Sequence, residues 1–176
     1  MPVLRQIAQL GHPVLRTPAD PVAFPLSAPT RALIDDMLAT LREADGVGIA
    51  APQVYEPLQI FLVAPKPNPR YPEAVEEAPI VVVNPEIVER SDEMVRGWEG
   101  CLSIPGLRGE VPRHRRIVAR FRGLDGAEVV RPFEDFVARI FQHEDDHLRG
   151  LTFLDRLESP RDLVAEREFR RRLAPG

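Results

Sequence analysis

The sequence contains a single cysteine, Cys101, and this excludes an internal disulfide. It has no apolar run near the roughly 20 residues of a transmembrane helix. The N-terminal residues Met-Pro-Val-Leu-Arg also lack the apolar core of a secretory signal. We therefore expect a cytoplasmic protein with no membrane partner. The net charge of −4 argues against a strong whole-molecule attraction to nucleic acid, so we expect no direct nucleic-acid specificity.

The size and composition of the chain suit an ordinary globular protein. Its 176 residues are 44% hydrophobic and 28% charged, which predicts one domain spanning residues 1–176. Nineteen prolines predict many loops and few long uninterrupted elements. We expect a monomer, with a dimer as the alternative.

Apolar periodicity predicts three helices separated by strands. The first 26 residues are proline-rich and predict an extended arm. Leu33, Met37 and Leu41 form an apolar stripe on the first helix. The order of elements predicts an α+β fold, with antiparallel or mixed β-sheets packed around a central metal-binding helix and with an N-terminal and a C-terminal helix. The expected helices cover residues 27–44, 132–150 and 160–173, the expected strands begin with 58–64, 80–83 and 87–88, and residues 65–79 are expected to be a solvated loop.

The strongest chemical signal is a pair of histidines at helical spacing. The segment 142–150 contains His-Glu-x-x-His, with His143, Glu144 and His147. Residues four apart lie one turn above each other on one helix face, so the two imidazoles can bind one metal ion. Glu144 is placed to act on a water at that ion. Two histidines leave the site incomplete, because a catalytic site usually has three protein ligands and one open position.

Three candidates compete for the third ligand. One metalloprotease class has a histidine three residues after the motif glycine. Here Phe153 occupies that position, three residues after Gly150, and excludes that class. Glu158 or Glu166 would complete a His₂Glu set, although both lie in a charged segment where solvated glutamates are expected. Cys101 lies between two glycine- and glutamate-bearing turns, and a thiolate with two imidazoles suits Zn²⁺ or Fe²⁺. A zinc endopeptidase with Glu166 as ligand and a non-enzymatic metal- or peptide-binding module stay as alternatives.

Two further segments are expected to serve this site. Residues 46–53 read Gly-Val-Gly-Ile-Ala-Ala-Pro-Gln, which predicts a tightly packed loop ending in the amide of Gln53. On the second helix, Phe136 and Ile140 share the face of the two histidines, so the wall next to the metal should be apolar. The basic cluster 113–116 is expected to be a solvated strand entry.

Together these segments resemble the three motifs of the peptide deformylase family. Residues 46–53 match the first motif, Glu99-Gly100-Cys101-Leu102-Ser103 the second, and residues 142–147 the third, in the same order and with similar spacing. The similarity extends over about residues 3–157 and includes Asn84-Pro85 and Arg108-Gly109 with Val111.

The resemblance implies removal of the N-formyl group from the formyl-methionine of new bacterial or organellar polypeptides. Similar enzymes bind one Fe²⁺ per chain, which Zn²⁺, Ni²⁺ or Co²⁺ replaces. It implies that Cys101, His143 and His147 hold this ion, and that Glu144 is the general base and acid.

The resemblance also assigns the substrate site. The Gln53 amide and the backbone N–H of Leu102 would stabilise the oxyanion. The methionine side chain would enter an apolar pocket beside His143, and the peptide would pair as an added strand with residues 47–49. The implied substrate-binding residues are Val47, Gly48, Ile49, Gly100, Arg108, Phe136 and Ile140.

The expected partners are N-formylmethionyl nascent peptides. In similar bacterial enzymes a C-terminal helix touches the ribosome, but the run Arg170-Arg171-Arg172 alone does not establish that contact. The proline-rich insertion at 65–79 is longer than in the shortest members of the family, and Gly97-Trp98 before the second motif resembles the variant that has a tryptophan there.

Overall fold

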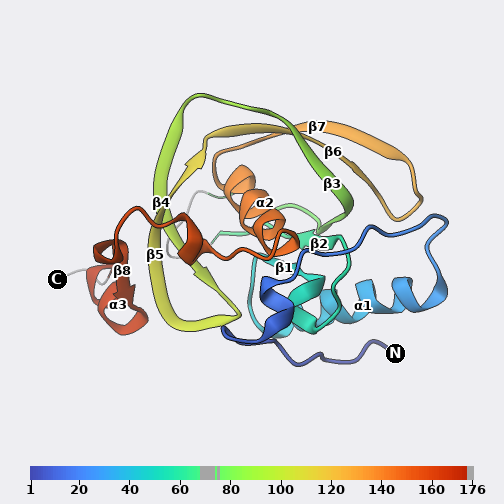
Figure 1. The fold of residues 1–176 in the computed structure, drawn as a ribbon, viewed down its shortest axis with the longest axis horizontal. Coiled ribbons are helices and arrows are strands. Elements are labelled where there is room, and N and C mark those ends of the chain that lie inside the picture. The colour runs from blue at the N-terminus through green and yellow to red at the C-terminus, as the bar shows by residue number, and fades with distance from the viewer. Residues whose placement is uncertain (68–73, 75, 174–176) are drawn as a thin grey trace.

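The computed structural model describes residues 1–67, 74 and 76–173, which form a mixed α+β fold (Figure 1). Its α-helices are α1 (Ala28–Glu43), α2 (Asp135–Leu148) and α3 (Glu166–Leu173). Its strands are β1 (Gly48–Ala50), β2 (Ile60–Val63), β3 (Ile80–Arg90), β4 (Met94–Cys101), β5 (Ile104–His114), β6 (Arg116–Arg122), β7 (Glu128–Glu134) and β8 (Leu163–Ala165). Short 3₁₀ turns cover Pro13–Arg16, Ala51–Val54, Phe153–Arg156 and Pro160–Asp162.

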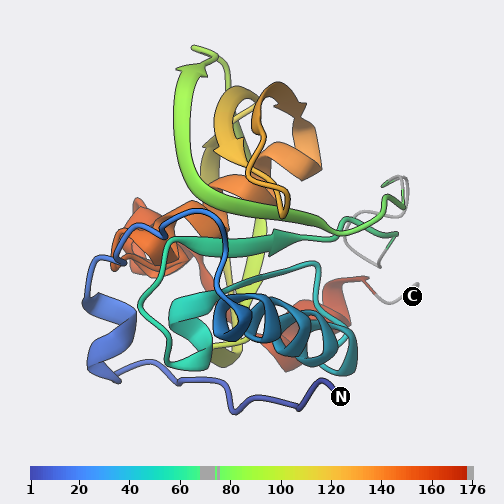
Figure 2. The same ribbon diagram turned by 90° about the vertical axis from the view of Figure 1, so that its right-hand side faces the viewer.

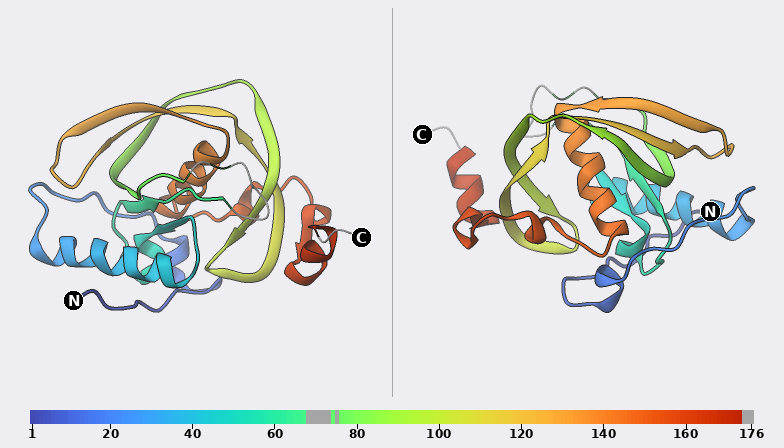
Figure 3. Two further views of the ribbon diagram at one scale, coloured as in Figure 1. Left: turned by 180° about the vertical axis from the view of Figure 1, so that it is seen from behind. Right: turned by 45° about the horizontal axis from the view of Figure 1, so that its top comes forward.

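The strands form two antiparallel sheets. The five-stranded sheet has the order β1-β2-β3-β6-β7, and the three-stranded sheet has the order β4-β5-β8. Figure 1 shows α2 at the centre, with β3, β4 and β5 curving around it, and the two views in Figure 3 show the same arrangement. The expected fold class is confirmed, with the histidine-bearing helix in the middle of the molecule.

The first sheet is covered on both faces, and β2 shows why its sequence is continuously apolar. Ile60 and Leu62 pack into a cluster with the apolar stripe of α1, whereas Phe61 and Val63 pack into a second cluster with α2. Successive side chains of a strand point to opposite faces, so a strand covered on both sides has no polar positions. Figure 2 shows α1 below β2, with the N-terminal arm running along the underside.

The N-terminal arm is extended, as expected, apart from the 3₁₀ turn Pro13–Arg16, and it is tied to the body by backbone hydrogen bonds. The amide of Ala8 donates to the carbonyl of Gln53 at 2.8 Å, and the amide of Leu10 donates to the carbonyl of Ser103 at 2.8 Å. The arm therefore bridges two of the three motif segments.

The first helix follows the prediction closely. Ser27 precedes α1 and its hydroxyl accepts from the amide of Thr30, as an N-cap does. The second helix begins later than predicted, because residues 128–134 pair with β6 instead. Pro132 lies opposite Val118 in that ladder, and β7 is an edge strand, where a missing N–H is tolerated.

Two other segments also differ from the prediction. The predicted loop 46–53 contains β1 and a 3₁₀ turn. The predicted helix 160–173 divides into a 3₁₀ turn, β8 and α3, because residues 163–165 add to the edge of β5. The strand pieces 80–83 and 87–88 are joined into one strand with irregular register near Asn84, which has φ +50°. The predicted loop 65–79 lies partly outside the described residues, at 68–73 and 75.

Among the described residues, no helix is both long enough and apolar enough to cross a membrane.

Candidate metal centre

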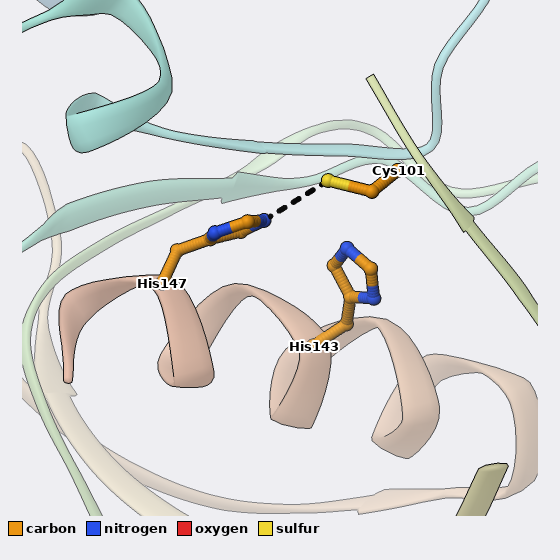
Figure 4. A group of neighbouring side chains, drawn as sticks. All are labelled: Cys101, His143 and His147. Atoms are coloured by element: carbon orange, nitrogen blue, oxygen red, sulfur yellow. Dashed lines mark hydrogen bonds between the residues drawn. The ribbon is translucent and has the colours of Figure 1, made fainter. Parts of the chain in front are cut away.

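Cys101, His143 and His147 come together at the centre of the molecule, as Figure 4 shows. One ligand atom from each residue lies within 4.8 Å of the other two. The Cys101 sulfur is 3.3 Å from Nε2 of His147. The histidines are on consecutive turns of α2, and the cysteine is the last residue of β4. Of the candidates for the third ligand, the tertiary structure therefore brings Cys101 beside the two histidines.

The two glutamates considered as alternative ligands are held in ion pairs elsewhere. Glu166 pairs with Arg108 and Arg170, and Glu158 pairs with Arg96. Phe153 is fully buried and stacks on His143, with 6.3 Å between ring centroids. Neither glutamate belongs to the Cys-His-His group that the described residues form.

Glu99 fixes the orientation of His143. Its Oε2 is 2.8 Å from Nδ1 of His143. The same carboxylate accepts from Arg113 at 2.9 and 3.0 Å and from Arg139 at 2.9 Å. Burial raises the pKa of Glu99, but Arg113 and His143 outweigh it and hold that pKa well below its usual range. Because Glu99 is then an anion that only accepts, Nδ1 of His143 must donate, and Nε2 is left for a metal.

The prediction that the basic cluster 113–116 is solvated was wrong for Arg113. Its side chain is 5% exposed and pairs with Glu99 and with Asp146, at 2.6 Å for the second pair. Arg115 and Arg116 are about half exposed, as predicted. The sequence prediction also missed Arg139, which lies one turn before His143 on α2 and donates to Glu99 and to three backbone carbonyls. Its position four residues before a candidate ligand was the available signal.

Glu144 lies against β1. A Cβ on Gly48 would be 2.3 Å from Glu144 Oε1 and 2.9 Å from Ile140. Only a residue without a side chain allows this close approach. Burial raises the pKa of Glu144 to about 7, although His143 and His147 act in the opposite direction. Glu144 Oε2 is buried without a hydrogen-bond partner among the described residues.

Gln53 is locked so that its amino group faces the cysteine. Its Oε1 accepts from the amide of Ala50 at 2.8 Å. Its Nε2 is 3.4 Å from the Cys101 sulfur and 3.2 Å from the Ser103 hydroxyl. The side chain is 1% exposed, so this arrangement is held by packing as well as by hydrogen bonds. The prediction that the segment 46–53 delivers an amide donor to the site agrees with this geometry.

The chemistry of the donor set fits a divalent ion. Burial raises the pKa of the Cys101 thiol, but His147 and His143 outweigh burial and lower that pKa to about 5. A thiolate and two imidazoles are borderline-soft ligands that suit Zn²⁺ and Fe²⁺. His147 is completely buried and its Nδ1 has no hydrogen-bond partner in the part of the chain that the structure describes.

A cavity of about 320 Å³ opens beside Cys101 and His143, whereas His147 is not among the residues that line it. Its wall contains many of the residues predicted to act in catalysis or substrate binding, namely Val47, Gly48, Gln53, Gly100, Cys101, Leu102, Arg108, Phe136, Ile140, His143 and Glu144. Ile49 is different, because its side chain is buried in the cluster with α1. The cavity wall also includes Trp98, Glu99, Arg139 and, toward solvent, Asp45 paired with Lys66.

Known proteins that are similar to this chain in sequence and structure belong to one family. A sequence model of the family described as polypeptide deformylase matches residues 4–162. Peptide deformylase 2 of Nostoc sp. is 50% identical over 96% of this chain and 94% of its own length, and peptide deformylase 1 of Bordetella pertussis is 45% identical over 92% of this chain and 90% of its own.

Solved structures agree with these relatives. A class I type b peptide deformylase from Acinetobacter baumannii with bound Met-Ala-Ser has a TM-score of 0.86 and 46% identity, covering 89% of this chain and 100% of its own. The peptide deformylase of Thermotoga maritima has a TM-score of 0.79 and 35% identity, covering 89% of this chain and 99% of its own. Similarity of this extent, over motifs that meet at one cavity, shows that the chain belongs to the polypeptide deformylase family.

Proposed function

We propose that the Cys101-His143-His147 centre, with Glu144 beside it, performs the reaction of the family on N-formylmethionyl peptides. Members of this family are hydrolases that remove the N-formyl group from new polypeptides. The observation that carries the assignment is the group of three possible ligand atoms, beside a cavity lined by Cys101, His143, Glu144 and Gln53.

The family depends on a metal, and the ligands proposed for it are Cys101, His143 and His147. We propose Fe²⁺ as the native ion, one per chain, with Zn²⁺, Ni²⁺ or Co²⁺ as replacements, because all of these accept a thiolate and imidazoles. A bound ion supplies Lewis acidity, which activates water and polarises the formyl oxygen. Glu99 holds the second imidazole nitrogen of His143 and so fixes the direction of its free nitrogen.

Glu144 is proposed as the group that takes a proton from the attacking water and returns it to the leaving amine. Its Oε1 is held close to Gly48 at the edge strand β1, and its Oε2 has no partner among the described residues, so an oxygen is available for a proton. The carboxylate is 4% exposed, which keeps bulk water from competing for this proton.

Gln53 and Leu102 are proposed to stabilise the oxyanion. The amino group of Gln53 is aimed at the centre because its carbonyl is fixed by the Ala50 amide. Leu102 follows the cysteine at the turn between β4 and β5, and its backbone N–H is the second proposed donor. Donors held in place before the reaction lower its barrier because they need no reorganisation.

The substrate is proposed to lie along β1. Within the described residues, β1 is the edge of the five-stranded sheet, so residues 47–49 can pair with an added strand. The methionine side chain would enter the cavity between Val47, Phe136 and Ile140, beside His143. Ile49 contributes through its backbone, since its side chain faces α1. Gly100 and Arg108, on the other wall, are proposed to contact the peptide beyond the methionine.

We place the reaction in the cytoplasm, with the protein acting as a single-domain monomer on nascent chains. The ribosome is the proposed site of encounter, and co-sedimentation with ribosomes tests it. Two of the C-terminal arginines pair within α3, Arg170 with Glu166 and Arg171 with Glu168. Arg172 lies over the Trp98 ring.

The direct test is turnover of formyl-Met-Ala-Ser by protein prepared anaerobically with Fe²⁺. We expect release of formate, and Glu144→Gln should retain metal while losing at least about 10²-fold in kcat. Cys101→Ser should lose tightly bound metal, measured by metal analysis after gel filtration. A wild-type protein that binds metal but releases no formate would contradict the enzymatic assignment and favour a binding module.

A further inference from the structure

Arg108 lies directly on the backbone of Gly100 at the cavity. A Cβ on Gly100 would be 1.4 Å from Nη1 of Arg108, so any other residue at position 100 would displace this guanidinium. Gly100 precedes Cys101, and both Gly100 and Arg108 line the cavity. The arginine therefore covers the wall next to the proposed metal ligand while its side chain stays 23% exposed.

Glu166 holds this guanidinium from behind. Its carboxylate forms an ion pair with Nε of Arg108. The pairing follows from the fold, because β8 adds to the edge of β5 with Val164 opposite Arg108, and Glu166 comes two residues later as the first residue of α3. Partial burial raises the pKa of Glu166, but the positive charges of Arg108 and Arg170 outweigh it and hold that pKa below its usual value, so the carboxylate stays charged.

The helix that carries Glu166 is itself anchored at the cavity. Phe169 is 4% exposed and packs on Trp98, with 5.1 Å between ring centroids. Trp98 lines the same cavity as Arg108. Figures 1 and 3 show β8 and α3 on the outer side of the β4–β5 sheet, away from α1. The C-terminal segment thus supports the cavity wall that bears Arg108.

Glu166 occupies only one edge of the guanidinium. In the described part of the chain, its carboxylate forms an ion pair at Nε of Arg108, and that Nε makes no hydrogen bond. The two terminal NH₂ groups remain for a ligand, and their planar geometry suits a peptide carbonyl or carboxylate. We propose that Glu166 is a positioning residue that acts through Arg108, fixing its guanidinium over Gly100 to bind an oxygen of the substrate downstream of its first residue.

This inference rests on the proposed function, which supplies the peptide that Arg108 meets. The structure adds what holds Arg108, and it gives Glu166 a role other than metal binding. A long arginine side chain loses rotamer freedom when it binds, and a fixed partner removes part of that cost before the substrate arrives.

The test compares Glu166→Gln with Glu168→Gln. Both residues are on α3, but Glu168 is 53% exposed and pairs with Arg171. With formyl-Met-Ala-Ser, Glu166→Gln should raise KM about tenfold with kcat unchanged, while Glu168→Gln should behave as wild type. With N-formylmethionine amide, which has no downstream residue, KM should be the same in all three proteins.

A double variant separates positioning from general damage to the fold. In an Arg108→Met background, adding Glu166→Gln should leave KM unchanged, because the residue through which Glu166 acts is gone. A further rise in KM in that background would overturn the inference. An equal rise with N-formylmethionine amide, or no rise with the tripeptide, would also overturn it.

Trp98 provides a second measurement that needs no turnover. It is the single tryptophan of the chain and lines the cavity, so its fluorescence reports binding of the product peptide Met-Ala-Ser. Glu166→Gln should weaken this binding about tenfold, again with Glu168→Gln as control. If wild-type protein turns over the substrate but both glutamine variants match it, only the inference about Glu166 fails. If the wild type is inactive, the proposed function fails and the titration alone decides the inference.

Discussion

Replacing Glu99 with glutamine should weaken both the fold and the metal site. The carboxylate receives four hydrogen bonds, two on each oxygen. Arg113 and Arg139 donate to Oε1, and Arg113 and His143 donate to Oε2. Glutamine has one oxygen and one NH₂ group, so in either orientation two of the four donors face another donor.

The expected loss of stability follows from this count. Hydrogen bonds to charged groups contribute about 1.5–3 kcal/mol each, and removing one partner of a buried ion pair costs about 3–5 kcal/mol. Arg113 keeps Asp146, and Arg139 keeps three carbonyls, so we expect the lower part of that range, about 3 kcal/mol. Glutamine in place of the partner of His143 should also weaken metal binding by about 10- to 100-fold.

Two measurements check these values. Denaturant unfolding of metal-free protein gives the change in the free energy of unfolding, and competition with a chromophoric chelator gives the change in metal Kd. Glu110→Gln is the matched control, because Glu110 is on the same sheet, is 37% exposed and lies 3.6 Å from Arg96. A Glu99→Gln protein with unchanged metal affinity, and stability within about 0.5 kcal/mol of the control, would refute the role assigned to Glu99.

Two further predictions concern the site and the N-terminal arm. Gly48→Ala should displace Glu144, because the added Cβ would lie 2.3 Å from its carboxylate. We expect kcat to fall by about 10² with metal content unchanged, and Gly123→Ala, in the β6–β7 turn, serves as control. A fully active Gly48→Ala enzyme would contradict the proposed proton transfer. The Asp36 carboxylate accepts hydrogen bonds from the side chain of Arg5 and from the backbone amide of Val3 in the arm. The hydrogen bond from Val3 lowers the pKa of Asp36 below its usual range, although partial burial acts in the opposite direction. Its stabilising effect is therefore present above the unfolded pKa of about 3.9 and is lost as pH falls through the folded pKa. Asp36→Asn should cost about 1 kcal/mol in urea unfolding at pH 7, and a difference that stays constant down to about pH 3 would count against this ion pair.

Local spacing accounts for the part of the site that the sequence predicts best. His143, Glu144 and His147 lie on α2 as expected, because helical geometry turns a spacing of four residues directly into neighbouring positions. The same reasoning predicted the apolar wall from Phe136 and Ile140. The amide of Gln53 was anticipated from composition, but its alignment by the amide of Ala50 was not.

Element boundaries were less predictable, because proline permits more than one structure. Pro132 suits the first turn of a helix, and it also suits an edge strand, which it occupies here opposite Val118. Likewise Pro160 was predicted to begin a helix that continues to residue 173, but residues 163–165 pair with β5 instead. Whether such a segment becomes helix or strand depends on its pairing with a distant strand, and no local sequence pattern shows that pairing.

Partners from distant segments of the chain determined which charged residues are buried and paired. Arg113 and Arg115 belong to one basic cluster, but Arg113 is buried because Glu99 and Asp146, 14 and 33 residues away in sequence, meet it. In the same way Glu166 became the partner of Arg108 when β8 paired with β5.

The sequence by itself determined the class of fold and the neighbouring positions of His143, Glu144 and His147 on one helix. Only the tertiary structure decided that Cys101, and not Glu158 or Glu166, lies beside the two histidines, since it alone places the sulfur 3.3 Å from His147. The physical reason is that helix geometry relates residues a few positions apart, whereas ligands from separate strands are related by how the whole core packs.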